Sequence, residues 1–335
     1  MVGVTPSAEN RTRREAAKKE FVKLFDELTG YQHRWQAWQD MVWLFAATIA
    51  NSIKTPHWEQ REARYLEIIR KYDPKKQQLF PELFARLVCV MDDAVNAGDY
   101  GDFLGELYMT LGLGNDAGGQ FFTPYSVCLA MSEITYDDKV KNEIARKGWI
   151  SCNDCACGAG ATLISMCEVL RRHDVNYQQH CFFVGQDIDY VTGLMCYIQL
   201  SLLGCAGYVH IGNTLTDPMT GHVLFADGGE NTWYTPMYYS DTWELRRQCV
   251  RIRRLLGLPE EAPEQEAHQT AQEPQEQPTQ EQAAQEQTIS EPVEPVPLVE
   301  TEKKPPKKPA EKPEKKTPKK PRKVKPEQIS MFEVM

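Results

Sequence analysis

The chain has no run of about 18 consecutive apolar residues, the length that a membrane-spanning helix needs. Residues 1–20 also lack the apolar segment of a secretory signal. The ten cysteines follow no regular framework, which, with the missing signal, indicates reduced thiols and a cytoplasmic protein. The formal net charge is −9, which argues against a protein that covers nucleic acid without sequence preference but not against a local basic patch.

The C-terminal part has few residues that could form a core. Of the 21 prolines, 14 lie from Pro259 onwards. Residues 260–302 contain twelve Glu and no Lys, Arg or Asp, whereas residues 303–325 contain twelve Lys or Arg and two Glu. Such segments bury too little apolar surface to offset chain entropy, so we expect a disordered tail over 258–325. Its Lys/Pro block is either a solubilising linker or a segment that contacts phosphate backbones without sequence preference.

Residues 9–112 have the periodicity of helices. The strongest pattern lies within 31–53, where large apolar residues recur at spacings of three and four: Trp35, Trp38, Val42, Phe45 and Ile49. Further helices are expected near 58–72 and 79–96. The aromatic residues are expected to pack in a core rather than to form a binding surface. Residues 1–114 are therefore predicted to form a helical N-terminal domain.

Residues 115–257 alternate between two kinds of pattern. Short apolar runs predict strands at 149–152, 181–184, 208–211 and 222–226. Helical patterns occupy 124–133, 160–173, 190–203 and 241–256. Strands that alternate with helices are typical of a parallel sheet, so the predicted fold class is α/β, with a shortened, mostly parallel sheet after the helical domain.

Three of the predicted strands end in residues suited to a nucleoside. The first is followed by Asp154-Cys155-Ala156-Cys157-Gly158-Ala159-Gly160, whose glycines permit a tight turn before a helix start that favours an anion. Asp187 ends the second strand, where an acid can accept hydrogen bonds from ribose hydroxyls. Asn213 ends the third with an amide that can read an adenine edge. Because ligands bind at the carboxyl ends of parallel strands, we expect one common site.

The cysteines near the first strand have a different interpretation. Cys152, Cys155 and Cys157 have the spacing C-x2-C-x-C, but no second pair and no nearby His follows at zinc spacing. We therefore expect them to be buried as small apolar residues, with no metal site.

These motifs resemble those of N6-adenine DNA methyltransferases, specifically the modification subunit of type I restriction systems. The resemblance covers about 115–227, and four motifs carry it: Gly119-Gln120-Phe121-Phe122-Thr123-Pro124, Asp154–Gly160, Gly185-Gln186-Asp187 and Gly212-Asn213-Thr214-Leu215. It implies a Rossmann-like methyltransferase fold over 115–257, S-adenosyl-L-methionine as cofactor and DNA as substrate.

The resemblance also implies roles for single residues. The methionine end of the cofactor would be lined by Gln120, Phe121 and Thr123. Its amino-acid group would be held at the glycine-rich turn by Asp154, Cys157, Gly158 and Gly160. Asp187 would hold the ribose and Asn213 the adenine. The family more often has Asp at position 213 and Pro at position 155.

The residues expected to bind the methyl acceptor, the target adenine, depart from the family pattern. The family's Asn/Asp/Ser-Pro-Pro-Tyr/Phe tetrad orients the target amino group and stacks on the flipped base. Here the predicted fourth strand is followed by Asp227-Gly228-Gly229-Glu230, which keeps the polar position but loses both prolines and the aromatic ring. Thr235-Pro236-Met237-Tyr238 offers one proline and an aromatic ring, so the catalytic candidates are Asp227 and Tyr238.

Two functions stay open at this point. One is an enzyme that methylates adenine N6 in DNA, completed by another methyltransferase or by a specificity subunit. The other is a non-catalytic, DNA-associated adaptor that keeps the cofactor site. The loss of both prolines and of the aromatic ring from the tetrad favours the adaptor, because methyl transfer needs these groups. The family resemblance favours the methyltransferase.

Residues 326–335 regain apolar character after the polar tail. Gln328-Ile329-Ser330-Met331-Phe332 resembles the Q-x-x-L/M-F peptide that docks on the bacterial sliding clamp of replication. Gln328 would be the polar anchor, and Met331 and Phe332 would fill an apolar groove. The adaptor function would use this peptide to bind the clamp.

Overall fold

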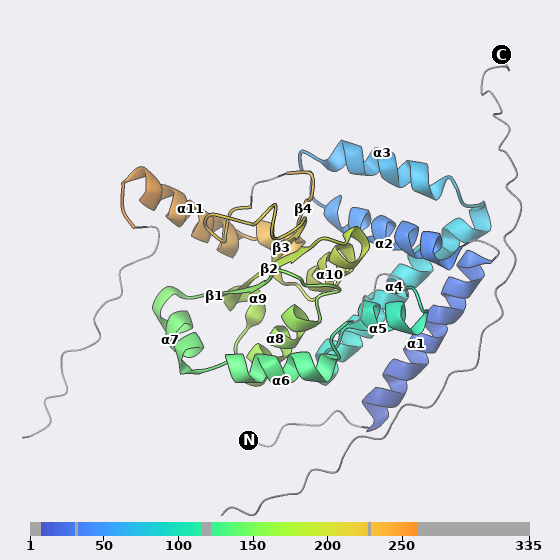
Figure 1. The fold of residues 1–335 in the computed structure, drawn as a ribbon, viewed down its shortest axis with the longest axis horizontal. Helices are drawn as coiled ribbons and strands as arrows, with labels where there is room; N and C mark the ends of the chain where they lie inside the picture. Colours follow the sequence, from blue (N-terminus) through green and yellow to red (C-terminus); the bar gives the residue numbers. More distant parts are fainter. Residues whose placement is uncertain (1–7, 31–32, 115–121, 227–228, 260–335) are drawn as a thin grey trace, which may run out of the picture. The chain divides into compact units, whose positions relative to one another are not determined.

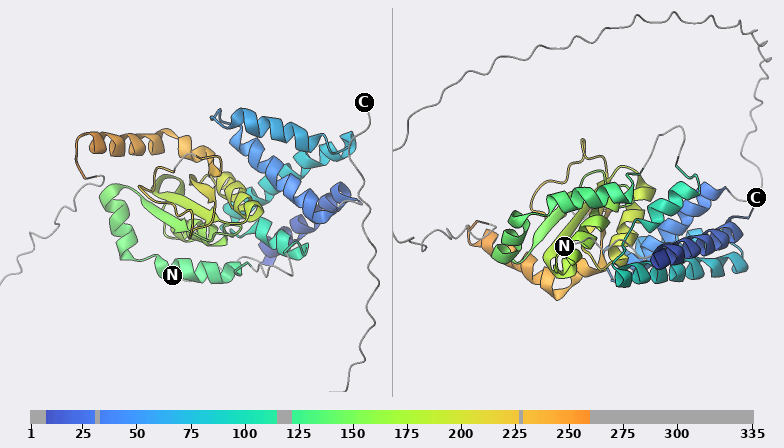
Figure 2. Two further views of the ribbon diagram at one scale, coloured as in Figure 1. Left: turned by 45° about the horizontal axis from the view of Figure 1, so that its top comes forward. Right: turned by 90° about the horizontal axis from the view of Figure 1, so that it is seen from below.

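The computed structural model of the protein describes residues 8–30, 33–114, 122–226 and 229–259, all of which belong to one compact unit, Met1–Gln269. The first part is helical, as expected, and comprises α1 (Ala8–Thr29), α2 (Arg34–Ala50), α3 (Trp58–Ile69), α4 (Pro74–Ala97) and α5 (Phe103–Thr110). Figures 1 and 2 show α1 to α4, in blue to cyan, gathered to one side of the sheet. No helix among these described residues is long and apolar enough to cross a membrane.

Helix α4 begins earlier than its apolar pattern indicates. The Asp73 carboxylate accepts hydrogen bonds from the backbone N–H groups of Lys75 and Lys76. Pro74 occupies the first helical position, where its missing N–H costs nothing. The proline therefore starts a helix here, five residues before the expected position.

The aromatic residues of α2 pack in the core, which confirms the prediction made from their spacing. Trp38, Val42 and Phe45 are buried and belong to one large hydrophobic cluster. Trp38 makes an edge-to-face contact with Phe25 of α1, at a centroid distance of 5.5 Å. This face of α2 is therefore a packing surface, and most of its stabilisation is apolar burial.

The second part of the chain forms the sheet and its helices. Its elements are α6 (Tyr125–Thr135), α7 (Asp138–Lys147), β1 (Ile150–Asp154), α8 (Ala161–Arg172), α9 (Tyr177–His180), β2 (Cys181–Asp187), α10 (Tyr190–Leu202), β3 (Ala206–Ile211), β4 (Thr232–Tyr234), η1 (Pro236–Tyr239) and α11 (Asp241–Leu255). The strand order is β1-β2-β3-β4, with the first three strands parallel and β4 antiparallel to β3. The predicted α/β class, with a mostly parallel sheet after a helical region, is confirmed.

Both faces of the sheet are covered. Successive side chains of β2 point to opposite faces, and both sets are buried. Phe183 points into the cluster that includes α8, α10 and the N-terminal helices. Phe182 points the other way, toward Trp243 of α11 at a centroid distance of 5.2 Å. The strand is therefore buried on both sides, as in a parallel sheet between helical layers.

Helix α10 joins the helical region to the sheet. Every residue from Val191 to Leu200 is buried, which is typical of a helix enclosed on all sides. It packs on α2 on one side and on β2 and β3 on the other. The indole N–H of Trp43 donates to the Tyr190 hydroxyl at 2.8 Å. The two regions thus share a single core, while the predicted domain limits at 114 and 257 stay a prediction.

The prediction of a strand at 222–226 is wrong. The backbone N–H of Phe225 donates to the carbonyl of His222 at 2.9 Å, and the N–H of Leu224 donates to the His222 ring at 3.2 Å. These bonds close a turn, which buries Leu224 against the outer sheet face without strand pairing. The fourth strand is instead β4, whose three residues are too few to show an alternating pattern.

Candidate functional site

The turn between β1 and α8 requires its glycines. Gly158 has φ +51° and Gly160 has φ +99°, in the region that favours glycine. A Cβ at Gly158 would lie 3.2 Å from the Phe122 ring, and one at Gly160 would lie 2.9 Å from Sγ of Cys196. Backbone conformation and close packing thus act together, so a side chain larger than hydrogen would be strained at both positions.

Hydrogen bonds bring this turn to the ends of the neighbouring strands. The N–H of Gly158 donates to Oδ2 of Asp187 at 2.7 Å, and the N–H of Cys157 donates to the carbonyl of Gln186 at 2.9 Å. The carbonyl of Asp187 in turn accepts from the N–H of Gly212, also at 2.9 Å. Asn213 follows directly. The three strand ends that were expected to converge therefore lie together.

Several polar groups at these strand ends keep hydrogen-bonding capacity. Oδ1 of Asp187 accepts from the N–H of Asp189 at 2.9 Å and from the Thr192 hydroxyl at 3.4 Å, whereas Oδ2, which accepts from Gly158, keeps a second lone pair. Oδ1 of Asn213 accepts from the N–H of Leu215 at 2.9 Å, while its amide nitrogen donates to none of the residues that the structure describes. Helix α8 has no side-chain cap, so its first N–H groups can bind an anion.

Asp154 holds the turn in shape. Its Oδ1 accepts from the N–H of Ala156 at 3.0 Å, and its Oδ2 accepts from the hydroxyl of Thr162 in α8. Both carboxylate oxygens are thus engaged within the turn, which fixes the start of α8 relative to β1. This is a positioning contact, and it lies beside the free N–H groups of the helix.

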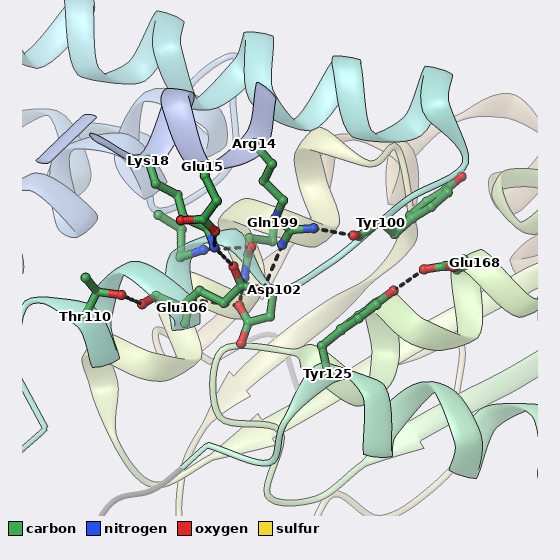
Figure 3. A network of polar contacts seen from close by, with 12 residues as sticks. Arg14, Glu15, Lys18, Tyr100, Asp102, Glu106, Thr110, Tyr125, Glu168 and Gln199 are labelled. Atoms are coloured by element: carbon green, nitrogen blue, oxygen red, sulfur yellow. Dashed lines mark hydrogen bonds and ion pairs between the residues drawn. The ribbon is translucent and has the colours of Figure 1, made fainter. Parts of the chain in front are cut away.

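A buried polar network contacts the turn at the carbonyl of Ala159, and Figure 3 shows the side chains that form it. Nε2 of Gln199, on α10, donates to Oδ1 of Asp102 at 2.8 Å and to the carbonyl of Ala159 at 2.9 Å. Oε1 of Gln199 accepts from the N–H of Leu104 at 3.1 Å. Burial raises the pKa of the Asp102 carboxyl to about 6, although the Gln199 amide and the backbone N–H of Gly105, which both donate to it, favour its charged form. Sequence reasoning missed this network; its one signal is a glutamine inside a mostly apolar helix.

The segment before α6 reaches the same place. The ring of Phe122 lies against Gly158, and the hydroxyl of Tyr125 donates to Oε2 of Glu168 on α8 at 2.6 Å (Figure 3). Thr123, between them, is exposed. Gln120 and Phe121, predicted to line the same site, lie outside the described residues.

The structure does not bring Tyr238 to the turn. Its ring packs on Phe182 near the amino end of β2, whereas Asp187 ends that strand. The Arg247 guanidinium lies over the same ring at 3.8 Å, and the Tyr238 hydroxyl donates to the carbonyl of Leu224 at 3.4 Å. Asp227, the other catalytic candidate, lies outside the described residues, as do Gln328, Met331 and Phe332 of the C-terminal peptide.

The three cysteines near β1 differ in exposure. Cys157 is buried, as predicted, Cys152 is half-buried, and Cys155 is exposed, contrary to the prediction. Cys155 lies in the turn that follows β1 and does not join the hydrophobic cluster that holds Cys157, so it is exposed. Burial raises the pKa of the Cys152 thiol to about 12, so this thiol stays protonated. Among the described residues, no group of three or more His, Cys, Asp or Glu is placed to hold a metal ion.

A mostly parallel sheet whose strand ends meet at a glycine-rich turn is the architecture of Rossmann-like folds. The family model for N-6 DNA methylase matches residues 101–259, which contain the whole of this sheet. The resemblance to N6-adenine DNA methyltransferases that was stated from the motifs is confirmed over these residues.

The chain was also compared with solved structures and curated proteins. One similar structure is the methyltransferase subunit of a type I restriction-modification system from Streptococcus thermophilus, at 13% identity and a TM-score of 0.35. The match covers 62% of this chain and 60% of that one, so the chain spans less than two thirds of that relative's length. No curated protein matches significantly.

Proposed function

We propose that this protein binds S-adenosyl-L-methionine at the glycine-rich turn and is a DNA adenine-N6 methyltransferase-like protein. The observation that carries the proposal is the hydrogen bond from Gly158 to Asp187, which joins the turn to the acid of the next strand. The family match supports the same chemistry. When bound, the cofactor supplies an electrophilic methyl group on its sulfonium.

The residues present fit the parts of this cofactor. The uncapped start of α8 suits the amino-acid carboxylate, with Asp154, Cys157, Gly158 and Gly160 shaping the turn beneath it. The remaining lone pair on Oδ2 of Asp187 suits a ribose hydroxyl, and the amide nitrogen of Asn213 suits an adenine ring nitrogen. Gln120, Phe121 and Thr123 are proposed to line the methionine end.

We expect Asp187→Ala to weaken S-adenosylmethionine binding by about 1–3 kcal/mol, because hydrogen bonds to a charged acceptor are lost. Isothermal titration calorimetry on the full chain measures this. Asp138→Ala is the matched control, since Asp138 is an exposed acid whose partner is Lys141 on α7. If the wild-type chain binds no cofactor, or if the two variants bind equally well, the assignment of this site is wrong.

Methyl transfer is a separate question from cofactor binding. The packing of the half-buried Tyr238 near the amino end of β2 favours the second candidate function, a cofactor-binding adaptor that does not itself methylate DNA. We expect the purified chain alone to transfer little or no labelled methyl to adenine in mixed DNA. Adding the products of neighbouring genes tests whether another methyltransferase or a specificity subunit completes the acceptor site. Robust transfer by the lone chain would establish the enzyme instead.

The C-terminal peptide is proposed to dock on the sliding clamp. We expect a peptide covering residues 326–335 to bind a purified bacterial clamp in fluorescence anisotropy. Met331→Ala combined with Phe332→Ala should abolish binding, because it removes both apolar side chains from the groove. Glu333→Ala is the control, since it leaves the motif unchanged. Unaltered binding by the double variant would dismiss the motif.

A further inference from the structure

Strand β1 lies at an open edge of the sheet. It pairs with β2 on one side, and among the described residues neither a strand nor a backbone hydrogen bond pairs with its other side. Figure 1 shows β1 at the border of the sheet, with β2, β3 and β4 following in order away from it. An unpaired row of N–H and C=O groups is a template for a further strand. This edge is therefore a candidate surface for another polypeptide.

The exposure of β1 differs from that of the strand beside it. In β2 the residues Cys181–Gln186 are all buried, whereas Ser151 and Asn153 of β1 are exposed. Ile150 and Cys152, whose side chains point to the opposite face, are half-buried. Because strands of parallel sheets are usually covered on both faces, β1 lacks part of the cover that its position in the sheet requires.

The two edges of the sheet differ in how well they are protected against pairing. At the far edge, β4 is only three residues long, and a short strand offers little backbone to pair with. β1 is five residues long and contains neither Lys nor Pro, which block many natural edges. Its single charged residue, Asp154, is engaged with Ala156 and Thr162 within the glycine-rich turn. The open edge of β1 is therefore the one suited to pairing.

A second copy of β1 matches this edge. Antiparallel pairing about a two-fold axis at Cys152 sets Ser151 opposite Asn153 of the second copy, and Ile150 opposite Asp154. No like charges then face each other, and the exposed polar side chains form two Ser–Asn pairs that can hydrogen-bond. The sequence of the strand is thus complementary to itself in this register.

The charges around β1 favour the same orientation. The last turn of α7, just before β1, carries Arg146 and Lys147, and Glu143 forms ion pairs with both, at 2.8 and 2.9 Å. The amino end of β1 therefore has an excess of positive charge, while its carboxyl end has Asp154. Antiparallel pairing sets each amino end beside the other carboxyl end, so opposite charges approach, whereas parallel pairing would bring like charges together.

We propose that two copies of this protein associate through the open edge of β1, in antiparallel orientation, so that their sheets join into one. The glycine-rich turn that follows each β1 then lies beside the amino end of the other β1, and the two turns face opposite ends of the joined sheet. A five-residue strand and its flanks make a small interface, so the expected dissociation constant is about 1–100 µM. The association does not depend on cofactor binding.

The test is sedimentation of the full chain over concentrations that span this range. A reducing buffer keeps the exposed Cys89, Cys155 and Cys249 from forming disulfides. Ser151→Lys combined with Asn153→Lys sets like charges opposite each other at both pairs and should weaken the dimer at least about 10-fold. Ser151→Lys combined with Asn153→Glu is the matched variant. It sets opposite charges at the same positions and should dimerise at least as tightly as the wild type.

Both positions are exposed, so both double variants should fold, and circular dichroism checks this. Met131→Lys is a further control, because α6 exposes an uncharged face that includes Val127, Met131 and Ile134. It should leave the dimer unchanged. Asp187→Ala should also still dimerise, which separates a failure of this proposal from a failure of the proposed cofactor site.

Three results would overturn the proposal. The first is a wild-type chain that stays monomeric throughout, which would leave the edge of β1 to a different polypeptide. The second is equal dimerisation of the two double variants, since the pairing of residues 151 and 153 would then be wrong. The third is dissociation by Met131→Lys, which would place the contact between the copies on α6.

Discussion

Gly160→Ala is expected to destabilise the protein by about 2–5 kcal/mol and to impair cofactor binding. The residue has φ +99°, which strains any L side chain, and the new Cβ would lie 2.9 Å from Sγ and 3.4 Å from Cα of Cys196. Relief of this contact would move the start of α8 and with it the N–H groups proposed to hold the cofactor carboxylate. Urea unfolding followed by circular dichroism measures the loss of stability.

Gly221→Ala is the matched control for this change. Gly221 has φ +96°, nearly the same backbone strain, but a Cβ there meets nothing within 4 Å. We expect it to cost about 1–3 kcal/mol from strain alone, so the difference between the variants isolates the packing contact with Cys196. Cys196→Ala should recover part of that difference. Equal losses in the two glycine variants would mean that close packing contributes nothing at Gly160.

Asp102→Asn is expected to change how stability depends on pH. Burial raises the pKa of the Asp102 carboxyl from 3.8 to about 6 in the folded state. A group whose folded pKa is raised stabilises the fold most below its unfolded pKa, and this contribution is lost as the pH rises through the window between 3.8 and about 6. From about pH 4.5 to about pH 7, we expect the wild-type chain to lose about 2 kcal/mol relative to Asp102→Asn.

Urea unfolding at several pH values between these limits measures the effect. The asparagine keeps a carbonyl oxygen that can accept from Gln199 and from the N–H of Gly105, so any constant cost of the substitution cancels in the comparison across pH. Asp93→Asn, on an exposed part of α4, is the control and should run parallel to the wild type. If Asp102→Asn also runs parallel, the buried carboxyl does not titrate in this window.

The strand ends of the site could be predicted because each has a local signal. Apolar runs mark β1, β2 and β3, and glycine at 158 and 160 marks the tight turn. The convergence of Asp187 and Asn213 then follows from the geometry of parallel strands, whose carboxyl ends share one edge. Each of these features is determined by residues close together in the sequence, and the structure contains all of them.

The remainder depends on contacts between residues far apart in the chain. Gln199 and Asp102 meet across 97 positions, and no periodicity marks either as polar core. Arg61 lies on a helix with ordinary surface composition, and its burial depends on Trp233, which belongs to a strand too short to detect. The apolar run at 222–226 failed as a strand because a side chain within it, His222, closes a turn.

The shared core also bears on how the chain is made at the ribosome. Trp43 and its partner Tyr190 are 147 positions apart, so at about 5–20 residues per second α2 emerges roughly 7–30 s before α10 is synthesised. During that interval the apolar face of α2 cannot yet pack against α10. Nascent chains stalled before residue 190 should therefore depend on chaperones more strongly than chains that extend past α10.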